Sequence, residues 1–185
     1  MKLLLTSCGL ETEKIKEKFL SYLTRSPLET KAVFIPTAAV YPDAIEVLPK
    51  CLNDLKKCGI PNSNIMVYDL HLPMDKNELY KYDVVYICGG SPHYLLHRIN
   101  EHKFGDALKR FLKNGGVVVG VSAGSIIFAD NMPGNLGMLK ATLNVHCTLE
   151  NSEQLGVLNL AKKSWVNLGN KQAIVFDEGD ISIIT

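Results

Sequence analysis

Long hydrophobic runs are absent from this sequence of 185 residues. The first apolar run, residues 3–5, ends at Thr6, which makes it too short for the core of a signal peptide and far too short to cross a membrane. Without an export signal, the five cysteines are expected to be reduced thiols rather than a disulfide framework. We therefore expect a cytoplasmic protein that does not bind a membrane.

Metal-binding cysteine motifs are also missing. Cys51 and Cys58 fall within one predicted helix, and no pair with the CxxC spacing accompanies them. Structural zinc sites commonly use such closely spaced pairs. We expect neither a metal site nor a cofactor.

Charge of one sign is not in excess, because the formal net charge is +1. Such a balance creates no strong field toward nucleic acid or anionic lipid, so neither is expected as a partner. Hydrophobic residues make up 46% and charged residues 21%, which is ordinary for a globular protein. No repeat, low-complexity tract or linker interrupts the chain, so residues 1–185 are predicted to form a single domain.

The sequence does contain a regular alternation of strand and helix patterns. Apolar runs rich in β-branched residues predict strands at residues 2–6, 32–36, 64–68, 84–88 and 117–121. Helical patterns lie between them at residues 11–24, 42–58, 94–100 and 104–114. The strands lack polar alternation, which indicates burial on both faces. The pattern predicts an α/β fold: a doubly wound, mostly parallel sheet with helices on both faces.

The pattern weakens after residue 129. We expect a short strand-like run at residues 142–146 and a helix at residues 152–163. A final pair of strands is predicted at residues 173–176 and 180–184, joined by a turn at residues 177–179.

Residues 120–124 (GVSAG) match the G-x-S-x-G pattern of a nucleophile elbow. The motif follows a valine-rich run and precedes an apolar helical stretch, residues 125–129. A sharp turn between strand and helix would raise the Ser122 hydroxyl above the sheet, with the N–H of Ala123 as one donor of an oxyanion hole. The alternative is a glycine-rich turn with a capping serine. The strand before it and the helix after it favour a nucleophile.

A serine nucleophile needs a base, and His146 is the only histidine that follows Ser122 in the chain. Its rival is His93, which follows a Gly-Gly turn and could instead contact the substrate from the same rim. An acidic residue is expected to orient the base. The residues by themselves leave Asp177 and Glu178 open for that role.

Together these motifs resemble the aspartyl dipeptidase, or peptidase E, family of serine peptidases, which has a class I glutamine amidotransferase-like fold. The matching stretches follow the family's order and cover most of the chain. They are residues 33–36 (VFIP), 87–90 with 94–96 (ICGG and YLL), 120–124 (GVSAG), 144–146 (NVH) and, more weakly, 177–179 (DEG).

The resemblance implies a peptidase that acts on short peptides, with Ser122 as nucleophile, His146 as general base and Glu178 as the residue that orients the base. It places the N–H of Gly90 as the second oxyanion donor. Ser91 and His93, at the same rim, are predicted to contact the substrate. A small peptide is the partner we expect, and a homodimer through exposed helices is an option that the sequence leaves open.

This chain also departs from the family. The family often has asparagine after its glycines, where this chain has Ser91 and Pro92. The dipeptidases recognise an N-terminal aspartate with arginines that follow the histidine, whereas the arginines here all precede Ser122, at positions 25, 98 and 110. These differences argue against a strict preference for N-terminal aspartate.

Two other functions remain open from the sequence. One is a cyanophycinase-like or other acyl hydrolase of the same fold. The other is a non-catalytic binding module that retains the elbow. Class I glutamine amidotransferases carry cysteine at the elbow, so Ser122 argues against them.

Overall fold

A sheet of eight strands forms the middle layer of the molecule in the computed structural model, which describes residues 1–75, 77–177 and 179–185. The strand order is β3-β2-β4-β5-β1-β9-β10-β7. The parallel strands are β1 (Lys2–Thr6), β2 (Ala32–Ile35), β3 (Ile65–Val67), β4 (Val84–Ile87) and β5 (Val117–Val121). An antiparallel extension follows, made of β9 (Ala173–Asp177), β10 (Asp180–Ile184) and β7 (Gly156–Val157).

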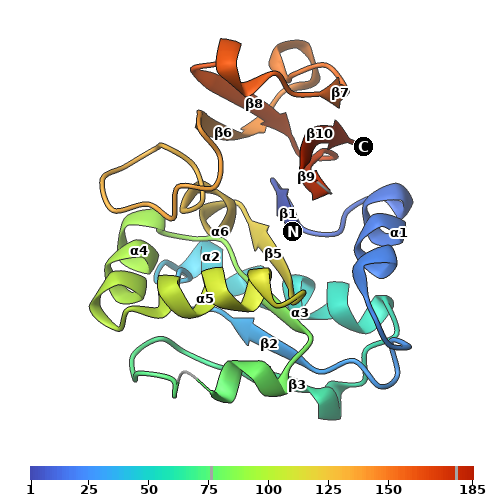
Figure 1. Cartoon of the computed structure of the whole chain (residues 1–185), viewed down its shortest axis with the longest axis vertical. Coiled ribbons are helices and arrows are strands. Elements are labelled where there is room, and N and C mark those ends of the chain that lie inside the picture. The colour runs from blue at the N-terminus through green and yellow to red at the C-terminus, as the bar shows by residue number, and fades with distance from the viewer. Residues whose placement is uncertain (76, 178) are drawn as a thin grey trace.

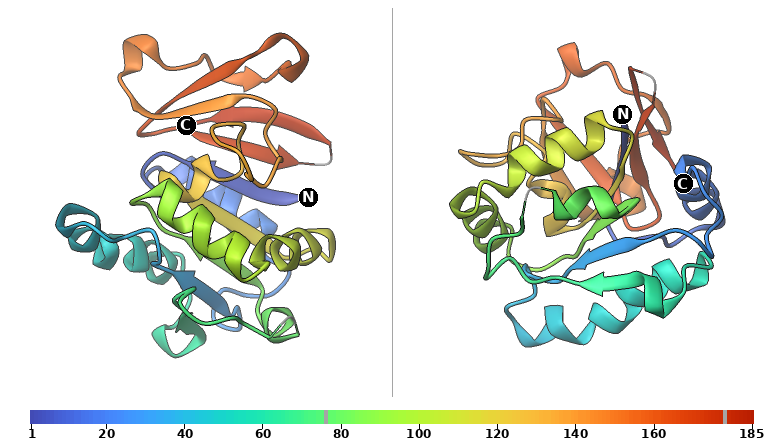
Figure 2. Two further views of the ribbon diagram at one scale, coloured as in Figure 1. Left: turned by 90° about the vertical axis from the view of Figure 1, so that its left-hand side faces the viewer. Right: turned by 60° about the horizontal axis from the view of Figure 1, so that its bottom comes forward.

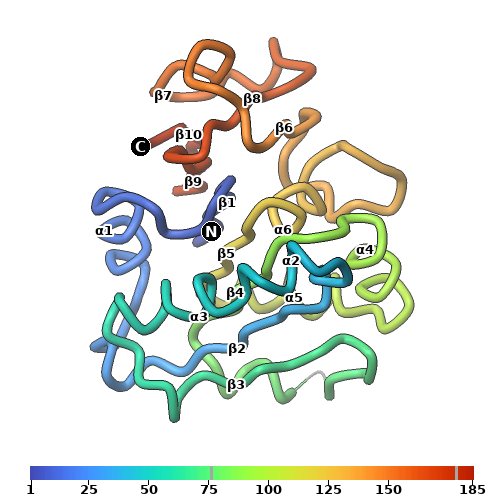
Figure 3. The backbone as a smooth tube through the Cα atoms, turned by 180° about the vertical axis from the view of Figure 1, so that it is seen from behind, coloured from blue at the N-terminus to red at the C-terminus, as the bar shows by residue number. Residues whose placement is uncertain are grey.

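Helices cover both faces of this sheet, which confirms the predicted three-layer α/β fold. Helices α1 (Glu13–Tyr22) and α3 (Leu48–Lys57) pack on one face, and α4 (Pro92–Glu101) and α5 (Phe104–Lys113) pack on the other (Figures 1 and 3). The short helices are α2 (Pro42–Glu46) and α6 (Ala123–Ile126), with 3-10 turns at Asn62–Asn64, Glu78–Lys81, Leu149–Asn151 and Leu160–Lys162. Among the described residues, no helix has the length and apolar character needed to cross a membrane.

A second, smaller sheet consists of two parallel strands, β6 (Thr142–Cys147) and β8 (Trp165–Gly169). It lies beyond the carboxyl ends of β1 and β5, beside α6 (Figures 1 and 2). Strand β8 was not predicted, but its pairing with β6 places the end of β6 over the edge of the main sheet.

The predicted helix at residues 152–163 is wrong. The segment contains β7 and the 3-10 turn at Leu160–Lys162 instead. Gly156 has a φ of 131°, which no helix can accommodate, and β7 pairs with the free edge of β10. Backbone pairing with a distant strand therefore decided the structure of this segment.

The predicted helix at residues 42–58 is divided into α2 and α3 at Val47. Pro49 has no N–H to donate to the carbonyl of Ile45, so the helix cannot continue without a break. The break leaves α2 as a separate turn of helix on the surface, with no buried side chain.

The strand register brings three loops to one edge of the sheet. Thr6 at the end of β1 pairs with Val121 at the end of β5, and Ile87 at the end of β4 pairs with Gly120. The carboxyl ends of parallel strands are where open α/β sheets bind ligands. The segments that follow β1, β4 and β5 therefore meet at the expected site.

Asp54 on α3 holds the segment that follows β1. One of its carboxylate oxygens accepts hydrogen bonds from the Leu10 N–H at 2.9 Å and from the Tyr86 hydroxyl at 2.7 Å. The residue is only 6% exposed, and this burial raises the pKa of its carboxyl group.

Replacing Asp54 with alanine should lower the free energy of unfolding by about 2–4 kcal/mol, because two buried donors lose their acceptor. Chemical denaturation measures the loss. The matched control is Asp130→Ala at an exposed position, which should change stability by no more than about 0.5 kcal/mol. Equal stability of the two variants would show that the Asp54 network does not support the fold.

Candidate active site

Ser122 lies at a sharp turn between β5 and α6. Its φ of 50° and ψ of −110° are rare for a residue with a side chain, as expected for the strained backbone of a nucleophile elbow. The Ser122 N–H donates to the carbonyl oxygen of Thr6 at 2.9 Å, which ties the elbow to β1. Helix α6 is a single turn, so it has no long helix dipole. At its start it presents free backbone N–H groups that can bind negative charge.

Glycines allow the backbone to pack closely around the elbow. A Cβ atom on Gly120 would lie 2.4 Å from the carbonyl oxygen of Gly124, and one on Gly124 would lie 2.3 Å from that of Ile87. Both distances are far below van der Waals contact. The glycines of the GVSAG motif are thus explained by close packing of β4, β5 and α6.

The loop after β4 contacts the loop after β2. Gly90 has a φ of 136°, and a Cβ atom there would lie 2.0 Å from the carbonyl oxygen of Ala38. Only glycine fits this position. Gly89 lies directly against Ser122, since its Cβ atom would lie 3.1 Å from that of Ser122.

His146 reaches Ser122 from the small sheet. The Oγ of Ser122 and the Nε2 of His146 are 2.9 Å apart. His146 has a φ of 59° and lies where the pairing of β6 with β8 shifts register, between Asn144 and Cys147. This bulge aims the imidazole at the elbow, as bulges near active sites often do. The structure therefore brings together the serine and histidine that the sequence singled out.

Asn170 contacts the other nitrogen of the imidazole. Its Oδ1 lies 2.9 Å from the Nδ1 of His146, in the turn between β8 and β9. An amide oxygen can only accept a hydrogen bond, so this contact fits the tautomer with the proton on Nδ1, in which Nε2 is free to accept a proton from Ser122. Sequence reasoning missed Asn170, since it considered only acidic residues for this role.

Glu178, predicted to orient His146, lies outside the described residues. Asp177, the other acid that the sequence left open, pairs with Lys18. It sits at the far end of β9, because Phe176 pairs with Leu3 near the amino end of β1. Asp177 is therefore at the edge of the sheet opposite to Ser122, so it does not contact His146.

Ser7 and Cys8, which follow β1, also contact His146, and sequence reasoning missed both. The His146 N–H donates to the Oγ of Ser7 at 2.6 Å, and this hydroxyl donates to the carbonyl of Leu168 on β8 at 3.2 Å. Ser7 thus joins the main sheet to both strands of the small one. The Sγ of Cys8 lies 3.6 Å from the Nδ1 of His146, and partial burial raises the pKa of this thiol.

A cavity of about 420 Å³ opens beside these groups. Ser122, His146, Gly89 and Gly90 line it, together with Ser7, Cys8 and Val121. The rest of the lining comes from Asp43, Ala44 and Val47, on α2 and at its end, and from Lys50 and Cys51 on α3. The volume suits a small ligand such as a short peptide.

Ser91 and His93 do not line this cavity. The Oγ of Ser91 accepts a hydrogen bond from the Tyr94 N–H at 3.3 Å, so this side chain caps α4. His93 is exposed in the first turn of the same helix. Their predicted substrate contacts are not supported by these positions.

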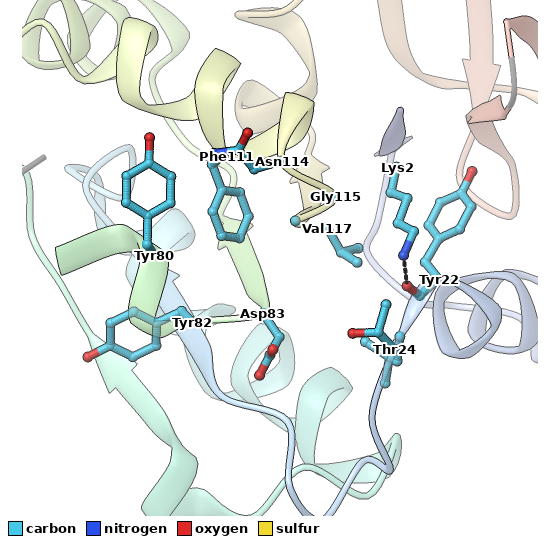
Figure 4. Close-up of a pocket in the computed structure, with 12 residues that line it drawn as sticks. Lys2, Tyr22, Thr24, Tyr80, Tyr82, Asp83, Phe111, Asn114, Gly115 and Val117 are labelled. Atoms are coloured by element: carbon cyan, nitrogen blue, oxygen red, sulfur yellow. Dashed lines mark hydrogen bonds between the residues drawn. The ribbon is translucent and has the colours of Figure 1, made fainter. Parts of the chain in front are cut away.

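A second cavity, of about 220 Å³, lies at the opposite edge of the sheet (Figure 4). Figure 4 shows Tyr80, Tyr82 and Phe111 on one side and Lys2, whose Nζ donates to the Tyr22 carbonyl at 2.7 Å, on the other. No serine, cysteine or histidine lines this cavity, so it contains no counterpart of the Ser122–His146 pair. Among the described residues, no group of three or more His, Cys, Asp or Glu side chains is placed to hold a metal ion.

Comparisons with known proteins show the family and the fold. The model of peptidase family S51 matches residues 3–184. A candidate peptidase E protein from Listeria monocytogenes EGD-e has a similar structure, with a TM-score of 0.72 and 18% identity over 100% of this chain and 98% of that chain. A peptidase from an acI-B1 actinobacterium has a TM-score of 0.63 and 16% identity, over 98% of this chain and 86% of that chain. No curated protein matches the chain.

Proposed function

The chain belongs to peptidase family S51 and is a serine-type peptidase, and from this premise we propose that it hydrolyses short peptides through an acyl-enzyme on Ser122. The observation that carries the proposal is the 2.9 Å contact between the Oγ of Ser122 and the Nε2 of His146. A hydroxyl becomes a nucleophile at neutral pH when such a base accepts its proton.

Acylation begins when the hydroxyl of Ser122 attacks the carbonyl carbon of the scissile peptide bond and His146 Nε2 takes its proton. The tetrahedral intermediate collapses, and the protonated imidazole gives the proton to the leaving amine. Water then attacks the acyl-enzyme with His146 again as base, and Ser122 is released. The open position of His146 leaves room for the amine to depart and for water to enter.

The oxyanion of each intermediate would be held by backbone N–H groups of Ala123 and Gly90. Ala123 is the first residue of α6, so its N–H has no acceptor within that helix. Gly90 lines the cavity next to Ser122, on the adjoining strand end. Two such donors, held in place before the reaction, stabilise the negative charge that develops in the transition state.

Asn170 would orient the base in place of an acid. Its Oδ1 accepts the Nδ1 proton and thereby holds the imidazole in the tautomer that can deprotonate Ser122. Cys-His-Asn sites in other proteases show that an amide can serve in this position. A neutral amide stabilises the imidazolium less than a carboxylate does.

Labelling with a fluorophosphonate tests the proposal. An activated serine reacts with the reagent, whereas the hydroxyl of a non-catalytic binding module does not. We expect a single adduct on Ser122 and none in the Ser122→Ala variant. Intact protein without any adduct, together with no cleavage of a dipeptide library, would contradict the proposal.

Replacing Asn170 with alanine should lower kcat about 10- to 100-fold with little change in KM, because the imidazole loses the group that sets its tautomer. Asn170→Asp should retain or raise kcat, since a carboxylate also accepts the Nδ1 proton. The comparison variant is Glu178→Gln, which removes the charge of the acid that the sequence assigned to this role; kcat should stay unchanged because Asn170 already accepts the Nδ1 proton. A large loss in Glu178→Gln and none in Asn170→Ala would assign the orienting role to Glu178 instead.

A further inference from the structure

The part of the cavity lining that α2 and α3 contribute carries two charged side chains, Asp43 on α2 and Lys50 on α3. The Nζ of Lys50 lies 2.9 Å from a carboxylate oxygen of Glu11, and the hydrogen bond to Glu11 raises the pKa of this lysine. The lysine charge is therefore already compensated within the protein.

Asp43 has no such compensation. Among the residues that the structure describes, none forms an ion pair or a side-chain hydrogen bond with its carboxylate. With the Lys50–Glu11 pair counted as neutral, the part of the lining that α2 and α3 contribute carries a net negative charge.

Asp43 does not contribute to the packing of α2 against the rest of the protein, because none of the α2 side chains is buried. Its neighbours Ala44 and Val47 contribute apolar surface to the same part of the lining. A carboxylate in the lining of the cavity that also contains the Ser122 hydroxyl can orient a substrate by its charge.

We propose that Asp43 determines specificity by binding a positively charged group of the substrate peptide close to the scissile bond. This inference rests on the proposed function of Ser122. It names the substrate class as peptides with an ammonium or guanidinium group, and it disfavours those with an acidic side chain. The cation is either the side chain of lysine or arginine or the free amino terminus, and both offer the same chemistry to the carboxylate.

Matched dipeptides separate the two sources. Lysyl-alanine and norleucyl-alanine differ in the side-chain ammonium, and norleucyl-alanine and its N-acetyl form differ in the terminal ammonium. In the wild type we expect the charged member of at least one pair to have a kcat/KM about tenfold higher, which is the size of one charge-assisted hydrogen bond in a partly exposed site. The pair that shows the ratio identifies the group that Asp43 binds.

The Asp43→Asn variant should reduce that ratio to near one, without lowering kcat/KM for the uncharged member. Glu46→Gln is the matched control, because Glu46 is an exposed carboxylate on the same helix that does not line the cavity. It should keep the wild-type ratio. Lys50→Gln should raise the ratio, because Glu11 then adds an uncompensated negative charge beside the cavity.

Unchanged ratios in Asp43→Asn, or ratios near one for both pairs of dipeptides in the wild type, would overturn the inference. Fluorophosphonate labelling separates this result from failure of the proposed function. A labelled Ser122 with unchanged ratios overturns the role of Asp43 alone. No label and no turnover on any of the peptides would overturn both.

Discussion

Ser122→Ala should abolish peptide hydrolysis, with kcat/KM falling by at least about 10⁴-fold. The variant removes the atom that forms the acyl-enzyme, so neither the base nor the oxyanion donors can replace it. The fold should be retained, because no hydrogen bond to the Ser122 side chain other than that of His146 is present in the described structure. Turnover of the preferred dipeptide and fluorophosphonate labelling measure the effect.

Ser125→Ala is the control for the loss of a hydroxyl from the same turn. Ser125 is fully buried, and its Oγ lies 2.8 Å from the carbonyl oxygen of Thr6 and 2.7 Å from that of Gly120. Its removal should lower stability by about 1–2 kcal/mol but leave the rate per folded molecule unchanged. Retained turnover in Ser122→Ala, or an adduct mapped to Ser125, would remove Ser122 from the mechanism.

His146→Asn should lower kcat/KM by about 10³- to 10⁴-fold and should prevent labelling of Ser122. Asparagine tolerates the left-handed φ of 59° at this position better than most residues, so the bulge of β6 should remain. Its amide can form a hydrogen bond to Ser122, but it cannot accept a proton from the hydroxyl. Steady-state kinetics on the same dipeptide gives the comparison.

Two further variants make the His146 result specific. His93→Asn removes an exposed imidazole that does not line the cavity, and it should retain wild-type turnover. His146→Gly leaves space beside Ser122 and suits the positive φ, so added imidazole should restore part of the labelling. If His93→Asn loses as much activity as His146→Asn, the base must be reassigned.

The region around Ser122 could be predicted because its signals are local. A valine run that is buried on both faces, two glycines and a serine between them determine a strand, a tight turn and a helix start within a few residues. The carboxyl ends of parallel strands lie at one edge of the sheet, so Gly90 and Ser122, which both follow predicted strands, were expected at the same edge. Both residues line one cavity, as expected.

The partner of the His146 Nδ1 could not be predicted in the same way. Asn170 follows a strand, β8, that the sequence did not indicate, and the segment before it was taken for a helix. The contact depends on the parallel pairing of β6 with β8 and on the bulge at the end of β6. Neither feature leaves a periodic pattern in the residues near Asn170.

The charge that α2 and α3 contribute to the cavity was likewise hidden. Asp43 and Lys50 were read as part of one helix, with nothing to indicate that they line the same cavity as Ser122. The break at Val47, caused by Pro49, separates α2 from α3 and shapes this side of the cavity. Glu11 pairs with Lys50 and so leaves the carboxylate of Asp43 without a compensating positive charge. Glu11 is far from both residues in the chain.

The amino-acid sequence by itself thus determined the α/β class, the mostly parallel sheet, and the identity of Ser122 and His146 as a candidate pair. Those features follow from short-range periodicity and from backbone constraints on glycine. Only the tertiary structure decided that Asn170 meets the imidazole, that Asp177 does not, and that Asp43 lines the cavity. Such contacts join residues that are distant along the chain, and strand pairing and packing, rather than local preference, bring them together.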